Sequence, residues 1–143
     1  MDMVLKVAAK AVIVDEAGKV LVLREAKTYD EGTNIGKYHL PGGRLNLGET
    51  YEAGLDREVM EETGLVVEQQ YPMYVGEWHP VIKGVPHQII ALFTVCKSKT
   101  SDVKLSEEHD DFRWIDAADM DKLDIMDPED KVLTRYFSSI KQV

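Results

Sequence analysis

The chain has 143 residues, 44% of them hydrophobic, and its 26 acidic and 17 basic residues give a formal net charge of −9. A chain of this length forms one domain around one core, so we expect a single domain over residues 1–143. The acidic balance argues against a binder of nucleic-acid polymers, which needs a basic surface for the phosphate backbone.

Two apolar runs at the start of the chain predict a β-hairpin. Residues 3–14 are rich in Val, Ile and Ala. Residues 19–24 form a second apolar run after an Asp-Glu-Ala-Gly turn and are expected as the return strand. Residues 25–37 are polar and contain two glycines. A loop of that length is often functional, so we expect it to border the binding site.

The segment between Thr50 and Gly64 predicts a helix. Thr50 is a suitable N-cap, and Gly64 suits the left-handed position that ends a helix. Gly54 lies inside this helix and costs about 1 kcal/mol relative to alanine. We therefore expect another part of the chain to pack closely against Gly54.

The second half of the chain predicts more strands and a final helix. Residues 65–78 and 88–96 are expected as strands around a turn-rich segment, and residues 112–115 as a short strand. A short helix should open at Asp116, and a longer one after Asp127, with Pro128 at its first position. The final helix carries an apolar stripe made of Val132, Leu133, Tyr136, Phe137 and Ile140. This order predicts the α/β class, with a mixed sheet and helices packed on it.

The single cysteine, Cys96, ends an apolar run and cannot form a disulfide within the chain. A buried structural thiol is its expected role, and a reducing, cytoplasmic compartment follows. Lys6 and Lys10 interrupt the first apolar stretch, so neither a secretory signal nor a membrane-spanning helix is expected.

Three glutamates occupy an unusual position on the predicted helix. At about 100° per residue, Glu58 and Glu62 fall about 20° to either side of Tyr51, next to the apolar side that carries Leu55. Glu61 falls further round, about 80° from Tyr51. A solvated charged face would instead lie opposite the apolar residues. The spacing therefore predicts that Glu58 and Glu62 point into a site.

Carboxylates that share one turn of a helix repel one another and need a neutralising partner. Arg57 is the only basic residue of this helix, and it lies four residues before Glu61, within pairing distance. Hard divalent cations such as Mg²⁺ and Mn²⁺ prefer oxygen ligands and bind between carboxylates and phosphates. The sequence thus favours a metal site on this helix.

The stretch from Gly43 to Leu65, GRLNLGETYEAGLDREVMEETGL, has the spacing of a complete Nudix box. The chain therefore resembles Nudix hydrolases of the MutT type, and the order of elements is similar over its whole length. The resemblance implies an α/β/α sandwich, a mixed sheet with helices on both faces. Gly54 and Asn46 depart from the residues that are usual at their positions.

The resemblance also implies roles for residues of the box. Glu58 and Glu62 correspond to ligands of Mg²⁺, or of Mn²⁺ in its place, and the Gly43 carbonyl is a further ligand. Glu61 corresponds to another ligand or to the residue that deprotonates the attacking water. Arg57 holds the glutamates in place and pairs with Glu49. A metal that bridges phosphate oxygens polarises phosphorus and lowers the pKa of bound water, which agrees with these roles.

The acidic segment Leu105–Trp114 resembles the part of several Nudix enzymes that precedes their last strand. By that match Glu108 is a further metal ligand or an alternative base, whereas a solvated acidic loop is the plain alternative. His109 is expected as a loop residue rather than a base, because a hard Mg²⁺ site does not need an imidazole.

Substrate recognition is weakly encoded. Arg24, Arg44 and Lys37 are candidates for phosphate binding. Aromatic residues that could stack on a base are Tyr29, Tyr38, Trp78 and Phe93. Pro80 resembles a position of ADP-ribose pyrophosphatases, whereas the Leu105–Trp114 segment resembles dinucleoside polyphosphate hydrolases.

The predicted function is hydrolysis of the pyrophosphate bond of a nucleoside diphosphate linked to another moiety. ADP-ribose-like compounds, nucleoside triphosphates and dinucleoside polyphosphates are the three substrate classes, and the partner is a small nucleotide. The alternative is a catalytically silent Nudix domain that binds a nucleotide for regulation. Many members of the family form homodimers, so the resemblance makes a homodimer a possible assembly of this chain.

Overall fold

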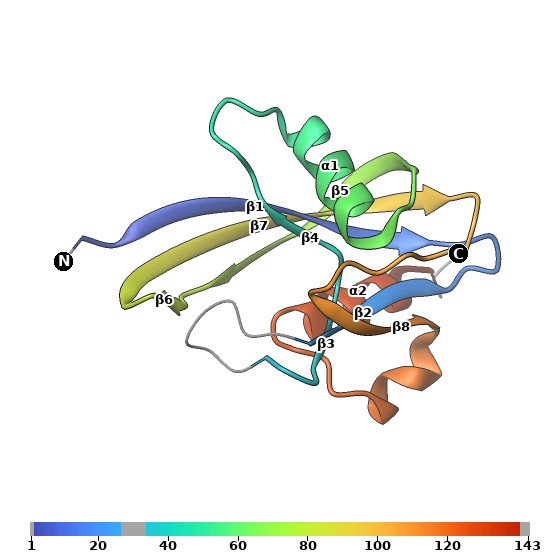
Figure 1. Ribbon diagram of the computed structural model, residues 1–143. Helices are drawn as coiled ribbons and strands as arrows, with labels where there is room; N and C mark the ends of the chain where they lie inside the picture. Colours follow the sequence, from blue (N-terminus) through green and yellow to red (C-terminus); the bar gives the residue numbers. More distant parts are fainter. Residues whose placement is uncertain (1, 27–33, 141–143) are drawn as a thin grey trace.

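A mixed β-sheet forms the centre of the fold in the computed structural model, which describes residues 2–26 and 34–140 (Figure 1). Its main strand order is β3-β2-β1-β7-β5, with β4 on β1, β6 on β7 and β8 on β2. The strands are β1 (Val4–Val14), β2 (Val20–Glu25), β3 (Tyr38–His39), β4 (Gly42–Arg44), β5 (Val67–Trp78), β6 (Val81–Ile82), β7 (Val85–Ser98) and β8 (His109–Ile115). Strands β1 and β7 run parallel, and the other paired strands run antiparallel.

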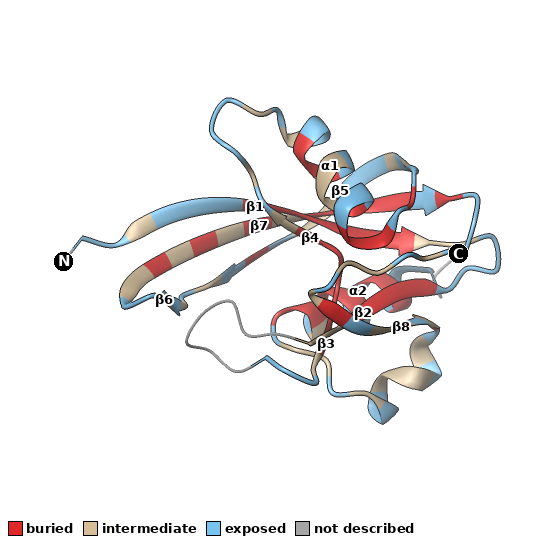
Figure 2. Ribbon diagram, viewed as in Figure 1, coloured by how far each residue is buried: buried red, intermediate tan, exposed pale blue. Residues whose placement is uncertain are grey.

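Helices α1 (Tyr51–Thr63) and α2 (Glu129–Ile140) cover opposite faces of this sheet, and the short 3-10 helix η1 (Ala117–Lys122) precedes α2 (Figures 1 and 2). Ala9 and Ile13 of β1 share an apolar cluster with Leu55 of α1. The alternate residue Val12 belongs to a second cluster with Val132 of α2. Side chains of a strand alternate between its faces, so β1 contributes to both layers, which confirms the α/β/α sandwich. Among the described residues, the helices are all too short or too polar to cross a membrane.

Local signals set both ends of α1. The Thr50 side chain accepts a hydrogen bond of 3.2 Å from the Ala53 N–H, and Gly64 ends the helix with a φ of 71°. The close packing expected at Gly54 is confirmed, because a Cβ added there would lie 2.3 Å from Leu45 Cδ2. The helix is therefore fixed at its ends by its own sequence and along its length by the loop before it.

Several predicted boundaries are wrong. Strand β8 begins at His109 rather than Phe112, because it continues its pairing with β2 as far as Glu25. Helix α2 begins at Glu129, one residue beyond the predicted start at Pro128. Ile140 lies in the last turn of that helix and is 45% exposed, so the buried stripe ends at Phe137.

Candidate active site

Two glycines bring the backbone of β4 against both β1 and α1. Gly42 has a φ of 133°, and a Cβ added there would lie 2.2 Å from the Ala9 carbonyl oxygen. A Cβ added at Gly43 would lie 2.7 Å from Glu58 Oε2. A side chain at Gly42 would collide with the backbone of β1, so glycine is required there, whereas a side chain at Gly43 would displace the Glu58 carboxylate. The backbone of β4 consequently lies directly beside the carboxylates of α1.

The three glutamates of α1 differ in burial as the helical spacing predicts. Glu62 is 7% exposed, and its Oε1 accepts a hydrogen bond of 2.7 Å from the Gly42 N–H. Burial raises the pKa of Glu62 to about 7, although the nearby Lys10 ammonium opposes it. Burial also raises the pKa of Glu58, which is partly buried. The Glu61 side chain is 58% exposed and lies at the rim.

Arg57 holds the acidic side chains together. Its Nε and Nη2 donate hydrogen bonds of 2.6 and 2.9 Å to the two carboxylate oxygens of Glu49. Its Nη1 lies 3.0 Å from Glu58 Oε1 and 3.3 Å from Glu61 Oε2. The Arg57 hydrogen bonds lower the pKa of Glu49 to about 2. A two-point contact with Glu49 fixes the plane of the guanidinium, which in turn fixes where Glu58 lies.

A cavity of about 510 Å³ opens beside these residues. Gly43 and the glutamates Glu58, Glu61 and Glu62 line one part of it, together with Glu108 and Arg44. Apolar side chains line another part: Trp78, Pro80, Ile82, Ile89 and Met126. The volume lies in the range of pockets that take small molecules. One cavity thus joins an acidic surface to an apolar wall.

The donor atoms at the acidic surface fit a divalent cation. Ligand atoms of Glu62, Glu108 and His109 lie within 4.8 Å of one another. Glu58 and Glu62 carry raised pKa values because burial opposes their ionisation. A bound cation would favour the charged carboxylates and supply the countercharge that burial withholds. Glu58, Glu62 and Glu108 therefore supply the oxygen ligands that a hard ion prefers, whereas such an ion has no need of the His109 imidazole.

Four predicted substrate residues of the described part of the chain lie outside the lining of this cavity: Arg24, Lys37, Tyr38 and Phe93. Arg24 donates a hydrogen bond of 2.6 Å from Nε to Asp110. Tyr38 is 4% exposed, and its hydroxyl donates to Asp111. Phe93 is fully buried in the core. Lys37 is also absent from the cavity lining among the described residues, and Tyr29 lies outside those residues. Of the aromatic and basic candidates, the cavity brings together Trp78 and Arg44.

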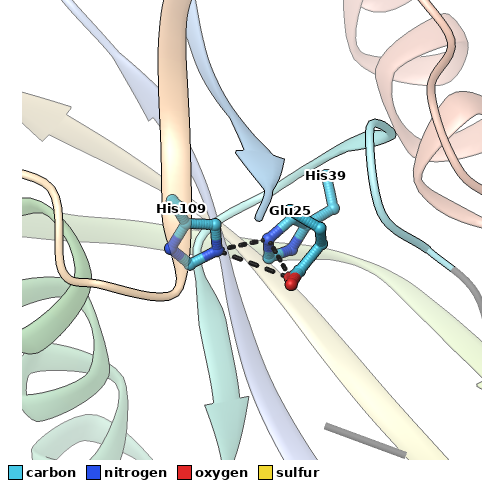
Figure 3. A group of neighbouring side chains, drawn as sticks. All are labelled: Glu25, His39 and His109. Atoms are coloured by element: carbon cyan, nitrogen blue, oxygen red, sulfur yellow. Dashed lines mark hydrogen bonds and ion pairs between the residues drawn. The ribbon is translucent and has the colours of Figure 1, made fainter. Parts of the chain in front are cut away.

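A buried polar cluster that the sequence did not predict borders the cavity. Lys10, Glu25, His39 and Glu129 line the part of the cavity that we call its floor. Figure 3 shows Glu25 and His39 together with His109. Lys10 Nζ lies 3.0 Å from Glu129 Oε1 and 3.1 Å from His39 Nδ1. His39 Nε2 lies 2.8 Å from Glu25 Oε1 and 2.8 Å from His109 Nε2. The expectation that His109 is a loop residue is wrong, because it begins β8 with a side chain that is 1% exposed.

Charges in this cluster compensate one another. Burial lowers the pKa of His39, and the Lys10 ammonium lowers it further. Burial raises the pKa of Glu25, but its contacts with the His109 and His39 imidazoles outweigh burial and bring that pKa to about 2. The one sequence signal for the cluster is Lys10, a basic residue inside a long apolar strand, since buried lysines are paired.

Comparisons with known proteins agree with this geometry. A family described as "NUDIX domain" matches residues 4–137. A "MutT-like protein" of Streptomyces ambofaciens is 38% identical over 109 residues, which are 76% of this chain and 62% of that protein, so the chain spans less than two thirds of its length. "Nucleoside triphosphatase NudI" of Klebsiella pneumoniae is 31% identical over 123 residues, 79% of this chain and 84% of that one. The crystal structure of a MutT protein from Methanosarcina mazei has a TM-score of 0.81 at 25% identity and covers 100% of this chain and 99% of its own.

Proposed function

The chain belongs to the Nudix family, and we propose that it hydrolyses the pyrophosphate bond of a nucleoside diphosphate linked to another moiety. The observation that carries this proposal is the placement of Glu58, Glu61 and Glu62 along one side of the cavity. Arg57 holds two of them from behind. A domain that only senses a nucleotide has no need for so many carboxylates beside the phosphates.

Mg²⁺, or Mn²⁺ in its place, fits the carboxylates of Glu58 and Glu62, with Gly43, Glu61 and Glu108 as further ligands. When bound, such an ion polarises the phosphorus centre and lowers the pKa of a coordinated water. Glu62 is held in place by the Gly42 N–H, so its second oxygen is free to act as a ligand. The acidic cavity would repel a free polyphosphate, which is a second reason to expect a cation there.

Glu58 and Glu61 are the candidates for the base that takes a proton from the attacking water. Both lie on a helix and contact Arg57, which limits their movement. Glu108 lies on the segment before β8 and lines the same cavity. We favour the helical pair, because a base must be held within hydrogen-bonding distance of the water as the reaction proceeds.

The apolar wall favours a nucleobase as one part of the substrate. Trp78 offers an aromatic face, and Ile82 and Met126 add apolar surface to the lining of the same cavity. Arg44 lies near Gly43 and can pair with a phosphate. A relative named nucleoside triphosphatase covers most of this chain, which supports a nucleoside triphosphate as substrate. Pro80 in the lining keeps ADP-ribose-like compounds as the second class.

Further proposals concern the setting of this activity. We propose one domain over residues 1–143 and a cytoplasmic location, for which the unpaired, buried Cys96 is the supporting observation. The acidic charge supports a small nucleotide as partner rather than a nucleic acid.

A substrate panel tests the proposal. Nucleoside triphosphates, ADP-ribose and diadenosine tetraphosphate are incubated with the protein in Mg²⁺, Mn²⁺ or EDTA, and the products are separated by chromatography. We expect a nucleoside monophosphate as one product, formed only with a cation. In ¹⁸O-labelled water, the label should enter a phosphate. Label on a sugar carbon, or failure to turn over any of these compounds, would contradict the proposal.

A further inference from the structure

We infer that Glu25, His39 and His109 form a binding site for a transition-metal ion at the floor of the cavity, in addition to the carboxylate site on α1. The ligand atoms are Glu25 Oε1, His39 Nε2 and His109 Nε2, which form a small triangle (Figure 3). Two imidazoles and one carboxylate are a donor set that zinc and other first-row transition ions accept.

The size of this triangle matches a single ion. Its edges are 2.8 Å between the two ring nitrogens, 2.8 Å from His39 to Glu25 and 3.4 Å from His109 to Glu25. Ligands about 2.0–2.1 Å from one ion lie about 2.9 Å apart at a right angle and about 3.4 Å apart at a tetrahedral angle. The three atoms are thus spaced as ligands of one ion would be.

The three atoms of this triangle have fewer protons between them than they have lone pairs facing one another. The Lys10 ammonium has only protons to give, so His39 Nδ1 must accept its hydrogen bond of 3.1 Å. The proton of neutral His39 is then on Nε2. His109 Nε2 lies 2.8 Å away and must be the unprotonated nitrogen, since two N–H groups would repel at that distance. One shared proton therefore holds three donor atoms together.

A divalent ion can take the place of that proton. The ion binds the lone pairs of His39 Nε2, His109 Nε2 and Glu25 Oε1, and the proton of His39 Nε2 leaves to solvent. The proton that Lys10 Nζ donates moves to His39 Nδ1, so His39 stays a neutral imidazole and Lys10 becomes a neutral amine. One M²⁺ enters and one H⁺ leaves, so the charge of the site rises by one.

Strand pairing builds the triangle from rigid elements. Glu25 ends β2, which pairs with β3 on one edge and β8 on the other. His109 of β8 is the direct partner of Glu25, and His39 of β3 is the partner of Leu23, two residues before Glu25. Ligands on strands keep their positions better than ligands on loops.

The chemistry of this site differs from that of the α1 carboxylates. Imidazole nitrogens favour zinc, iron, cobalt or nickel, whereas the oxygen ligands of α1 favour Mg²⁺ or Mn²⁺. Glu25 and His39 also line the cavity, so an ion held by three protein ligands keeps an open position toward the substrate space. Three protein ligands with one open position are typical of catalytic rather than structural zinc sites.

The test measures binding of Co²⁺ and Zn²⁺ rather than enzymatic activity. Excess Mg²⁺ is present so that the α1 carboxylates are already occupied. Co²⁺ binding is followed by visible absorption, and Zn²⁺ binding by NMR of the histidine ring nitrogens. We expect one Co²⁺ per chain and Zn²⁺-induced shifts of His39 and His109, with His87 unmoved.

Variants separate this site from others. His39→Gln should weaken Co²⁺ binding more than about 100-fold, since loss of a mere outer partner already costs 10–100-fold. Glu25→Gln keeps the shape and should weaken it as well. His79→Gln is the matched control, because His79 is exposed and paired with Glu77 at 2.8 Å without a third ligand. Unchanged binding in a folded His39→Gln variant would overturn the inference. If that variant does not fold, unshifted His39 and His109 signals in the natural chain would overturn it equally.

Discussion

The burial of Glu62 makes a prediction about stability without metal. In EDTA, we expect Glu62→Gln to be more stable than the natural chain at pH 8 and about equally stable near pH 4. Glutamine keeps the oxygen that accepts the Gly42 N–H but carries no charge. The variant therefore removes the cost of a buried carboxylate while preserving its hydrogen bond.

The magnitude follows from the pKa of Glu62, which burial raises from 4.5 to about 7. In the unfolded chain this carboxyl has the ordinary pKa of 4.5. Between pH 4.5 and about pH 7, the unfolded chain therefore binds fewer protons than the native chain. Stability therefore falls as the pH rises through that window, and the full cost is present above pH 7. A difference of this size corresponds to about 3 kcal/mol as an upper value, or a melting shift on the order of 10 °C.

Urea unfolding at pH 4 and pH 8 in EDTA measures this difference directly. Glu61→Gln is the matched control, because its side chain is 58% exposed and its neutralisation should leave the pH dependence unchanged. Mg²⁺ should stabilise the natural chain at pH 8 and stabilise Glu62→Gln much less. If Glu62→Gln keeps the pH dependence of the natural chain, or is less stable at pH 8, the reasoning about Glu62 is refuted.

Three further predictions concern activity. Arg57→Lys should lower kcat by about 100-fold, because lysine cannot bind both oxygens of Glu49 and still hold Glu58; an unchanged kcat would remove Arg57 as a positioning residue. Glu58→Gln should lower kcat by about 10²–10⁴-fold with little change in KM, and a larger loss for Glu108→Gln would move the base to the segment before β8. Trp78→Ala should raise KM for nucleotides more than it lowers kcat, and an unchanged KM in steady-state assays would exclude Trp78 from base binding.

The helix and its carboxylates were predictable because their signals are local. Thr50 and Gly64 are adjacent to the turns that they cap, and the spacing from Glu58 to Glu62 fixes which glutamates point inward. For the central sheet, the sequence predicted a mixed sheet covered by helices but not the order or direction of its strands. The sequence does not show that β1 and β7 run parallel, since that pairing joins residues more than 80 positions apart, such as Val4 and His87.

The floor of the cavity was not predictable for the same reason. Lys10, a basic residue in an apolar strand, is the one local signal. His39 and His109 lie on two other strands and look unremarkable among their neighbours in sequence. Only the pairing of β2 with β3 and β8 brings the histidines to Glu25. The start of β8 was predicted at residue 112 rather than at His109. That error placed His109 in a polar loop, where a residue is not expected to be buried.

The charges that line the cavity agree with the proposed dependence on cations. Among the described residues in that lining, seven are acidic, whereas only Lys10 and Arg44 are basic. Lys10 is already bound to Glu129 and His39, which leaves Arg44 as the basic side chain that can reach a phosphate. A polyphosphate entering this space meets repulsion that one arginine cannot offset. In the proposed reaction, bound cations would offset this repulsion beside the phosphates. The same acidity that repels free anions would then favour nucleotides that arrive bound to a metal.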